Sequence, residues 1–130
     1  MALPLGRLKR RAEFLRIAAA QRKWASPGLI LQCAPSTDAG ADALRVGYTC
    51  SRKIGGAVER NRAKRRLREA ARQILGVEAA LGNDYVLIGR RETLNRPFVL
   101  LLQDLRTALK RVGALRDGGA KNPPPGGAAP

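Results

Sequence analysis

With 130 residues, the chain has room for one domain, because globular domains typically span about 100–150 residues. Its formal net charge of +15 predicts a polyanionic partner, for which RNA, DNA and an anionic membrane all qualify. No apolar run approaches the roughly 20 residues that span a bilayer, and the first residues lack the apolar core of a signal peptide. We therefore expect a cytoplasmic protein with no membrane partner.

Few residue types in the chain suit catalysis or metal binding. The absence of histidine removes the commonest general base and the Ser-His and Cys-His nucleophile pairs. The ten Asp and Glu residues are scattered without paired spacing, so a two-metal nuclease site is not expected. Cys33 and Cys50 lie in apolar runs, where reduced thiols are commoner than a disulfide in such a compartment. We expect no catalytic residue, no metal site, no cofactor bound by the protein alone and no small-molecule substrate.

The first half of the chain predicts one helix and two strands. In chain order these lie over residues 11–21, 29–34 and 44–50, before a turn over residues 51–56 that has room for a short third strand. Phe14 and Ala18 share one face of the helix, where the simplest interpretation of Phe14 is a core residue. On the first strand, Ile30 and Gln32 share one face, and Leu29, Leu31 and Cys33 share the other.

The second half predicts a long helix that ends at Gly76, a strand over residues 84–89 and a helix that starts near Pro97. The last helix carries an apolar stripe of Phe98, Leu101, Leu102, Leu105, Leu109 and Val112. Residues 113–130 are rich in Gly, Pro and Ala and predict a disordered tail after a single domain of residues 1–112. The order α-β-β-(β)-α-β-α predicts an α+β fold, or α/β sandwich.

The most charged stretch, residues 51–73, holds nine Lys or Arg against two acids. On a helix, Ala63, Leu67, Ala70, Ala71 and Ile74 form one apolar stripe. Opposite it lie two polar rows, Asn61, Arg65, Arg68 and Arg72 in one and Arg62, Arg66, Glu69 and Gln73 in the other. Like charges at this spacing destabilise a helix, so the pattern favours a surface that docks phosphates. A localisation signal, a solubilising face or a disordered arm are the alternatives.

Three segments resemble the signature of the bacterial ribonuclease P protein subunit: LRVG at residues 44–47, SRKIG at 51–55 and AVERNRAKR at 57–65. Weaker similarity extends over about residues 7–112. The resemblance implies a mixed sheet packed by helices, with a left-handed βαβ crossover. It implies a protein that binds the catalytic RNA and the 5′ leader of precursor tRNA, and so assists endonucleolytic removal of the leader. Catalysis and the Mg²⁺ of the holoenzyme then belong to the RNA subunit.

The resemblance also assigns binding residues. Those that match the motif facing the RNA subunit, together with the other cations of the same stretch, are Arg52, Lys53, Arg60, Asn61, Arg62, Lys64, Arg65, Arg66, Arg68 and Arg72. Those at positions of the leader-binding cleft are Phe14, Ala18, Ile30, Gln32 and Lys53. Ala18 stands where relatives often carry a second aromatic residue, and Gln32 where they often carry tyrosine. Fewer rings for base stacking leave the strength and base preference of leader binding open.

Other functions fit parts of the pattern. A ribosomal or other structural RNA-binding protein shares the charge and size, but does not require the turn and the Arg-Asn-Arg motif. A DNA-binding module could place the basic helix in the major groove, but no dimer seam is evident. An autonomous nuclease lacks the necessary histidines and paired carboxylates.

Overall fold

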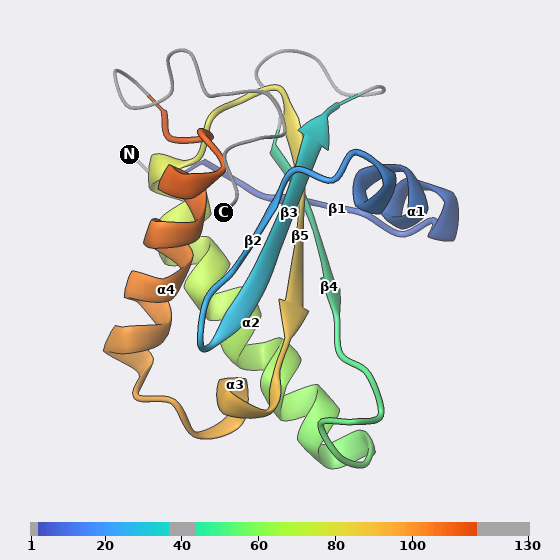
Figure 1. Cartoon of the computed structure of the whole chain (residues 1–130), viewed down its shortest axis with the longest axis vertical. Helices are drawn as coiled ribbons and strands as arrows, with labels where there is room; N and C mark the ends of the chain where they lie inside the picture. Colours follow the sequence, from blue (N-terminus) through green and yellow to red (C-terminus); the bar gives the residue numbers. More distant parts are fainter. Residues whose placement is uncertain (1–2, 37–43, 117–130) are drawn as a thin grey trace.

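The computed structural model describes residues 3–36 and 44–116, which form one sheet with helices on both faces (Figure 1). The elements are β1 (Gly6–Arg7), α1 (Arg11–Ala19), β2 (Lys23–Ala25), β3 (Leu29–Pro35), β4 (Leu44–Thr49), α2 (Ala57–Glu78), β5 (Asn83–Gly89), α3 (Arg91–Asn95) and α4 (Phe98–Arg111). The five strands are ordered β1-β4-β5-β3-β2. The predicted α+β class, a mixed sheet packed by helices, is confirmed.

The central strand, β5, is parallel to β4 and antiparallel to β3. The connection from β4 to β5 runs through α2. In Figure 1 both strands run downwards, β5 lies to the left of β4 and α2 passes behind the sheet, which makes this crossover left-handed. The usual rule is right-handed, so residue periodicity alone could not have predicted this connection.

The main core lies between the sheet and the pair α2 and α4. The apolar stripe predicted for the basic helix is buried there. The stripe of α4 joins it through Leu101, Leu105 and Leu109, which are fully buried. Leu29 and Leu31 of β3 point into the same core, as the alternation of that strand predicts.

The opposite face of the sheet is covered by α1 alone and holds a much smaller core. Its buried members are Leu8, Ile17, Ala34 and Val86, with Phe14 and Ile88 packed against them. Ile17 is the only buried residue within α1. Part of this sheet face therefore remains accessible.

Several elements differ from the sequence expectations. The short β1, β2 and α3 were not expected, and residues 51–56 form turns without a strand. The helix α2 also continues past Gly76 to Glu78. A glycine that ends a helix commonly adopts positive φ, whereas the described glycines with positive φ are Gly55, Gly82 and Gly113. Gly76 instead stays helical and buried.

The packed chain extends past Val112, the domain end expected from the sequence. Ala114 is fully buried, and its carbonyl accepts a 2.7 Å hydrogen bond from the Ala80 amide. Arg116 donates to the carbonyls of Gly76 and Ala79 at the end of α2, at 3.2 and 2.9 Å. These contacts satisfy carbonyls that a helix end leaves without partners. The rest of the expected tail, residues 117–130, lies outside the described residues.

Within the described ranges, no helix is long and apolar enough to cross a membrane. The same part of the chain contains no group of three or more His, Cys, Asp or Glu that could hold a metal ion. Cys33 and Cys50 are free thiols, Cys33 buried and Cys50 half-buried. Burial raises the pKa of the Cys33 thiol to about 11, so this side chain behaves as a small neutral core residue.

Candidate nucleic-acid interface

The outer surface of α2 carries most of the cations singled out in the sequence. We call Arg62, Arg65 and Arg68 the basic ridge. All three are exposed, because the opposite side of the helix is the buried apolar stripe. Arg62 and Arg65 make no hydrogen bond or ion pair within residues 3–36 and 44–116, so their guanidinium groups are available to a ligand. Asn61 is exposed beside them.

The turn before α2 sets the start of this surface. Gly55 has φ of 150°, and a Cβ there would lie 2.9 Å from the Cβ of Glu59, so a larger residue would be strained. The Glu59 carboxylate accepts a 3.0 Å hydrogen bond from the Gly56 amide and closes the first turn. Arg60 donates to the Gly55 carbonyl at 2.9 Å. One of the hydrogen-bond donors of Arg60 therefore stabilises the turn.

Two other arginines of the helix make contacts inside the protein. Arg66 is half-buried, donates to the Arg96 carbonyl and lies 5.7 Å from the centre of the Phe98 ring. It therefore faces the link between α3 and α4, away from the basic ridge. Arg72 is exposed but donates to the Glu69 carboxylate, and Arg72 and Gln73 lower the pKa of Glu69 to about 2. This acid offsets the Arg72 charge across the neutral pH range.

The remaining candidates for RNA-subunit binding flank the ridge. Arg52 and Lys53 are exposed in the turn after β4. The Lys53 carbonyl accepts a 3.2 Å hydrogen bond from Arg91 of α3, which ties this turn to the end of β5. Lys64 is half-buried on α2, and together with Arg60 it acts electrostatically to lower the pKa of Cys50, although burial raises that pKa overall.

The leader-binding candidates lie on the other side of the sheet. The Phe14 ring sits on Gly47 of β4, where a Cβ would come within 2.5 Å of the ring. Gly47 pairs with Val86 of β5, which pairs in turn with Gln32 of β3. Two strand spacings, about 10 Å, therefore separate Gln32 from the position under Phe14. The structure brings these residues to one surface.

Phe14 itself is half-buried, a state between a core residue and an open stacking platform. Ile30 and Gln32 are also half-buried, while Ala18 and Lys53 are exposed. Lys53 lies in the turn after β4, beyond the row of Thr49, Ile88 and Ile30 that the strand pairing defines. The leader candidates thus extend from α1 across the sheet towards the start of α2.

The position of α1 over the sheet depends on a buried acid that sequence reasoning missed. Asp84 is fully buried and accepts hydrogen bonds from Arg16 of α1 at 2.6 Å and from Arg45 of β4 at 3.0 and 2.7 Å. Arg45 also donates to Glu13 of α1 at 3.0 Å. The pKa of Arg45 is raised, chiefly by its hydrogen bonds to Asp84. The sequence did carry a signal for this role, because Asp84 is an acid at the start of an otherwise apolar strand.

A second buried acid, Asp104, is held in a similar way. It forms an ion pair with Arg96 and accepts a 2.9 Å hydrogen bond from the Gly28 amide. Because both buried carboxylates are paired with arginine, neither is available as a general acid or base in this state.

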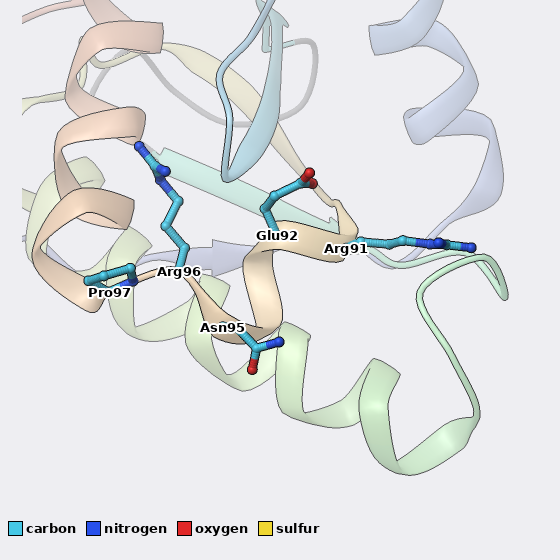
Figure 2. A pocket seen from close by; sticks show the side chains of 5 residues that line it. All are labelled: Arg91, Glu92, Asn95, Arg96 and Pro97. Atoms are coloured by element: carbon cyan, nitrogen blue, oxygen red, sulfur yellow. The ribbon is translucent and has the colours of Figure 1, made fainter.

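A hollow of about 380 Å³ lies at α3 and the link to α4. It is lined by Arg91, Glu92, Asn95, Arg96 and Pro97. Figure 2 shows that its side chains diverge, with Arg91 and Arg96 pointing to opposite sides. Arg96 is engaged by Asp104, and Glu92 adds an acid to the lining. This mixed charge makes the hollow less suited to a phosphate than the basic ridge is.

Comparisons of the whole chain identify similar proteins. A family model described as Ribonuclease P matches residues 5–113. The chain is 64% identical over 118 residues to the ribonuclease P protein component of Paramagnetospirillum magneticum, covering 89% of each chain. It is 50% identical over 107 residues to that of Gluconacetobacter diazotrophicus, covering 82% of this chain and 90% of the relative.

Solved structures agree with the sequence matches. The RNase P protein from Thermotoga maritima superposes with a TM-score of 0.68 at 31% identity, covering 81% of this chain and 96% of that one. The Staphylococcus aureus RNase P protein gives a TM-score of 0.66 at 27% identity, covering 80% and 92%. The chain therefore belongs to the ribonuclease P protein family, as a subunit of this endoribonuclease that assists maturation of the tRNA 5′ end.

Proposed function

We propose that the basic ridge of α2 binds the RNA subunit of ribonuclease P. The observation that carries this proposal is the exposed row of Arg62, Arg65 and Arg68 on a helix whose other side is buried. A guanidinium group donates two parallel hydrogen bonds to a phosphate, and its charge displaces condensed counterions. Asn61 adds an amide that donates and accepts, while Arg52, Lys53, Arg60 and Lys64 extend the positive field around the row. Arg72 lies at the end of this surface, where Glu69 offsets its charge.

Arg66 has a different role in this proposal. Its contacts with Phe98 and the Arg96 carbonyl give it a function inside the protein, where it supports the link that α4 follows. Arg66 is therefore proposed to position the RNA-binding surface rather than to contact the RNA directly.

The accessible part of the sheet beside α1 is proposed to hold the 5′ leader of precursor tRNA. Phe14 supplies an aromatic edge, Ile30 an apolar surface and Gln32 an amide that can hydrogen-bond a base. Ala18 on α1 and Lys53 in the turn after β4, both exposed, are proposed to extend this surface. With a single ring, stacking contributes about 1–3 kcal/mol rather than the sum of several platforms. Lys53 is in a position to contact a leader phosphate.

The division of labour follows from these groups. The protein neutralises phosphates, while the RNA carries the reaction and binds the Mg²⁺ that it needs. Arginines that replace counterions should lower the Mg²⁺ concentration at which the two subunits act together. The proposed partners are ribonuclease P RNA and precursor tRNA, in the cytoplasm, with no role for a membrane or a small-molecule substrate.

A cleavage assay tests the division of labour. Precursor tRNA is incubated with ribonuclease P RNA alone, protein alone and both, over a series of Mg²⁺ concentrations. We expect the mixture to cleave at low Mg²⁺ where the RNA alone is slow, and the protein alone to be inactive. Cleavage by purified protein that has been treated to remove RNA would contradict the proposal.

Binding measurements test the ridge itself. Arg65→Ala should weaken binding of the RNA subunit by about tenfold and make its salt dependence shallower by about one phosphate contact. Its thermal stability should match the wild type, because the side chain is exposed. Lys110→Ala, an exposed cation on α4, is the matched control and should bind normally. If Arg65→Ala binds the RNA subunit as tightly as Lys110→Ala does, the ridge is not part of the interface.

A further inference from the structure

A second hollow lies where the β1–β4 edge of the sheet meets α2. It has a volume of about 380 Å³ and is lined by Leu5, Gly6, Arg7, Tyr48 and Arg68. Tyr48 packs against the core on the α2 side of the sheet, so this hollow opens on the same side as the basic ridge. Neither Arg7 nor Tyr48 belongs to the motif that identified the RNA-binding stretch.

The polar groups of this hollow are suited to an anion. Arg7 and Arg68 contribute guanidinium groups, Tyr48 contributes a hydroxyl, and no acid is among the lining residues. The Arg68 guanidinium carbon lies 5.9 Å from the centre of the Tyr48 ring, so the two side chains are neighbours in the hollow. A tetrahedral phosphate has several acceptor oxygens and can take hydrogen bonds from all three groups.

The protonation of Tyr48 fits this arrangement. Burial raises the pKa of its hydroxyl, while the charges of Arg68 and Arg7 act in the opposite direction. The hydroxyl therefore remains protonated at neutral pH and can donate. Both arginines act on this one group, which agrees with their shared place in the lining of the hollow.

The nonpolar part of the lining points to a nucleotide rather than to a free phosphate ion. The Leu5 side chain, the Gly6 backbone and the Tyr48 ring lie beside the donors and offer contact surface for a ribose or a base. Arg68 belongs to both the hollow and the basic ridge, one turn beyond Arg65. A strand whose phosphates follow the ridge would reach the hollow without a break.

We propose that the hollow formed by Arg7, Tyr48 and Arg68 binds one backbone phosphate of the RNA strand that lies along α2, and seats its nucleotide against Leu5. The proposal rests on the proposed function, in which that strand belongs to the RNA subunit. It extends the interface from the helix to the N-terminal strand β1. The hollow in Figure 2 is less suited to a phosphate, because Glu92 lies in its lining and its Arg96 is already paired with Asp104.

Two variants test the phosphate contact without removing packing. Tyr48→Phe deletes the hydroxyl and keeps the ring, and Arg7→Gln removes a charge from an exposed side chain. Dissociation constants for ribonuclease P RNA are measured over a series of salt concentrations. We expect Arg7→Gln to bind about tenfold more weakly, with a salt dependence shallower by about one contact, and Tyr48→Phe to bind about threefold more weakly. Lys110→Gln serves as the matched control and should bind normally.

A coupling measurement then identifies the ligand group. RNA with a single uncharged methylphosphonate linkage is prepared for each phosphate protected by the protein. At one linkage the modification should weaken wild-type binding, yet have almost no further effect on Arg7→Gln. Inorganic phosphate at millimolar concentration should not compete with the RNA, since it lacks the nucleotide contacts.

The outcomes separate this proposal from the one on which it rests. Normal RNA binding by Arg7→Gln and Tyr48→Phe, together with weak binding by Arg65→Ala, would contradict a phosphate site in the hollow but would still support RNA binding by the basic ridge. Normal binding by all three would overturn both. Efficient competition by inorganic phosphate would show a free-ion site and contradict the nucleotide assignment.

Discussion

The two faces of the sheet are stabilised in different ways. Facing α2 and α4 is a large apolar core whose members include Leu67, Leu101 and Leu105, all fully buried. Facing α1 there are four buried apolar residues and an ion network centred on Asp84. The first face provides most of the burial that stabilises the fold. The second leaves part of the sheet accessible, and this is the surface that we propose for the 5′ leader.

This difference has a physical cause in the helices themselves. The helix α2 has seven buried residues along 22, whereas α1 has one along nine. A short helix with one buried residue cannot be held by apolar contact alone, so directional bonds to a buried carboxylate set its position. The position of α1 over the sheet therefore depends on those bonds.

The largest effect is expected in the main core. Leu67→Ala should lower the free energy of unfolding by about 2–5 kcal/mol, because it removes a fully buried side chain from close packing. Denaturant unfolding followed by circular dichroism measures this change. Val77→Ala, at an exposed position of the same helix, should stay within about 0.5 kcal/mol. A small effect at Leu67 would show that the α2 face is not the dominant core.

A smaller and more local effect is expected from the ion network. Asp84→Asn should destabilise the protein by about 1–3 kcal/mol, since it weakens bonds from two arginines whose other sides reach water. Hydrogen exchange should become faster in α1 while α2 remains protected. If hydrogen exchange becomes equally faster in α1 and α2, the two faces of the sheet unfold as one unit, which would contradict the proposed difference in how they are stabilised.

Leader binding provides the functional test of the accessible face. Phe14→Ala should raise the dissociation constant for precursor tRNA by roughly 5- to 150-fold, the loss of one stacking contact of about 1–3 kcal/mol, while mature tRNA binds as before. Leu15→Ala, whose side chain is 55% exposed on the same helix, is the control. An equal loss for both RNAs would instead identify Phe14 as a residue of the small core.

Adding a ring to this face should act in the opposite direction. Ala18→Phe places an aromatic side chain one turn from Phe14 at an exposed position, and should strengthen binding of precursor tRNA. Gln32→Tyr should do the same on β3. No gain from either variant would indicate that the leader does not reach this surface.

The smallest effect concerns the end of the packed chain. Deleting residues 117–130 should leave the free energy of unfolding within about 0.5 kcal/mol of the wild type, because Gly, Pro and Ala bury little. Deleting residues 113–130 should cost about 1–2 kcal/mol, since Arg116 no longer donates to the carbonyls at the end of α2. Thermal melting of both truncations checks the pair; equal melting temperatures would contradict it.

Much of the fold could be predicted because its signals are local. The apolar spacing of α2 and the alternation of β3 correctly predicted which residues are buried. In the stripe predicted for α4, Leu101, Leu105, Leu109 and Val112 are buried, whereas Phe98 and Leu102 are half-buried. The short β1, β2 and α3 were missed because two to five residues carry too little periodicity to be recognised. Gly76 was misread as a helix end because glycine composition does not reveal φ.

The binding surfaces divide in a similar way. The exposed positions of Arg62, Arg65 and Arg68 follow from helical spacing, since one stripe of the helix had to be buried. Spacing did not predict that Arg66 turns towards Phe98, because the link between α3 and α4 that it meets is distant in sequence. The same holds for Arg7 and Tyr48, which approach Arg68 only after β1 pairs with β4.

The sequence by itself determined the family, the α+β class, the apolar core under α2 and the charge of its outer surface. These depend on residue type and on separations of a few residues, where backbone geometry fixes which side chains share a face. Tertiary structure alone decided the burial of Asp84 between Arg16 and Arg45 and the approach of Arg7 to Arg68. Each of these joins segments that are far apart in the chain, and their contacts exist only once the sheet has assembled.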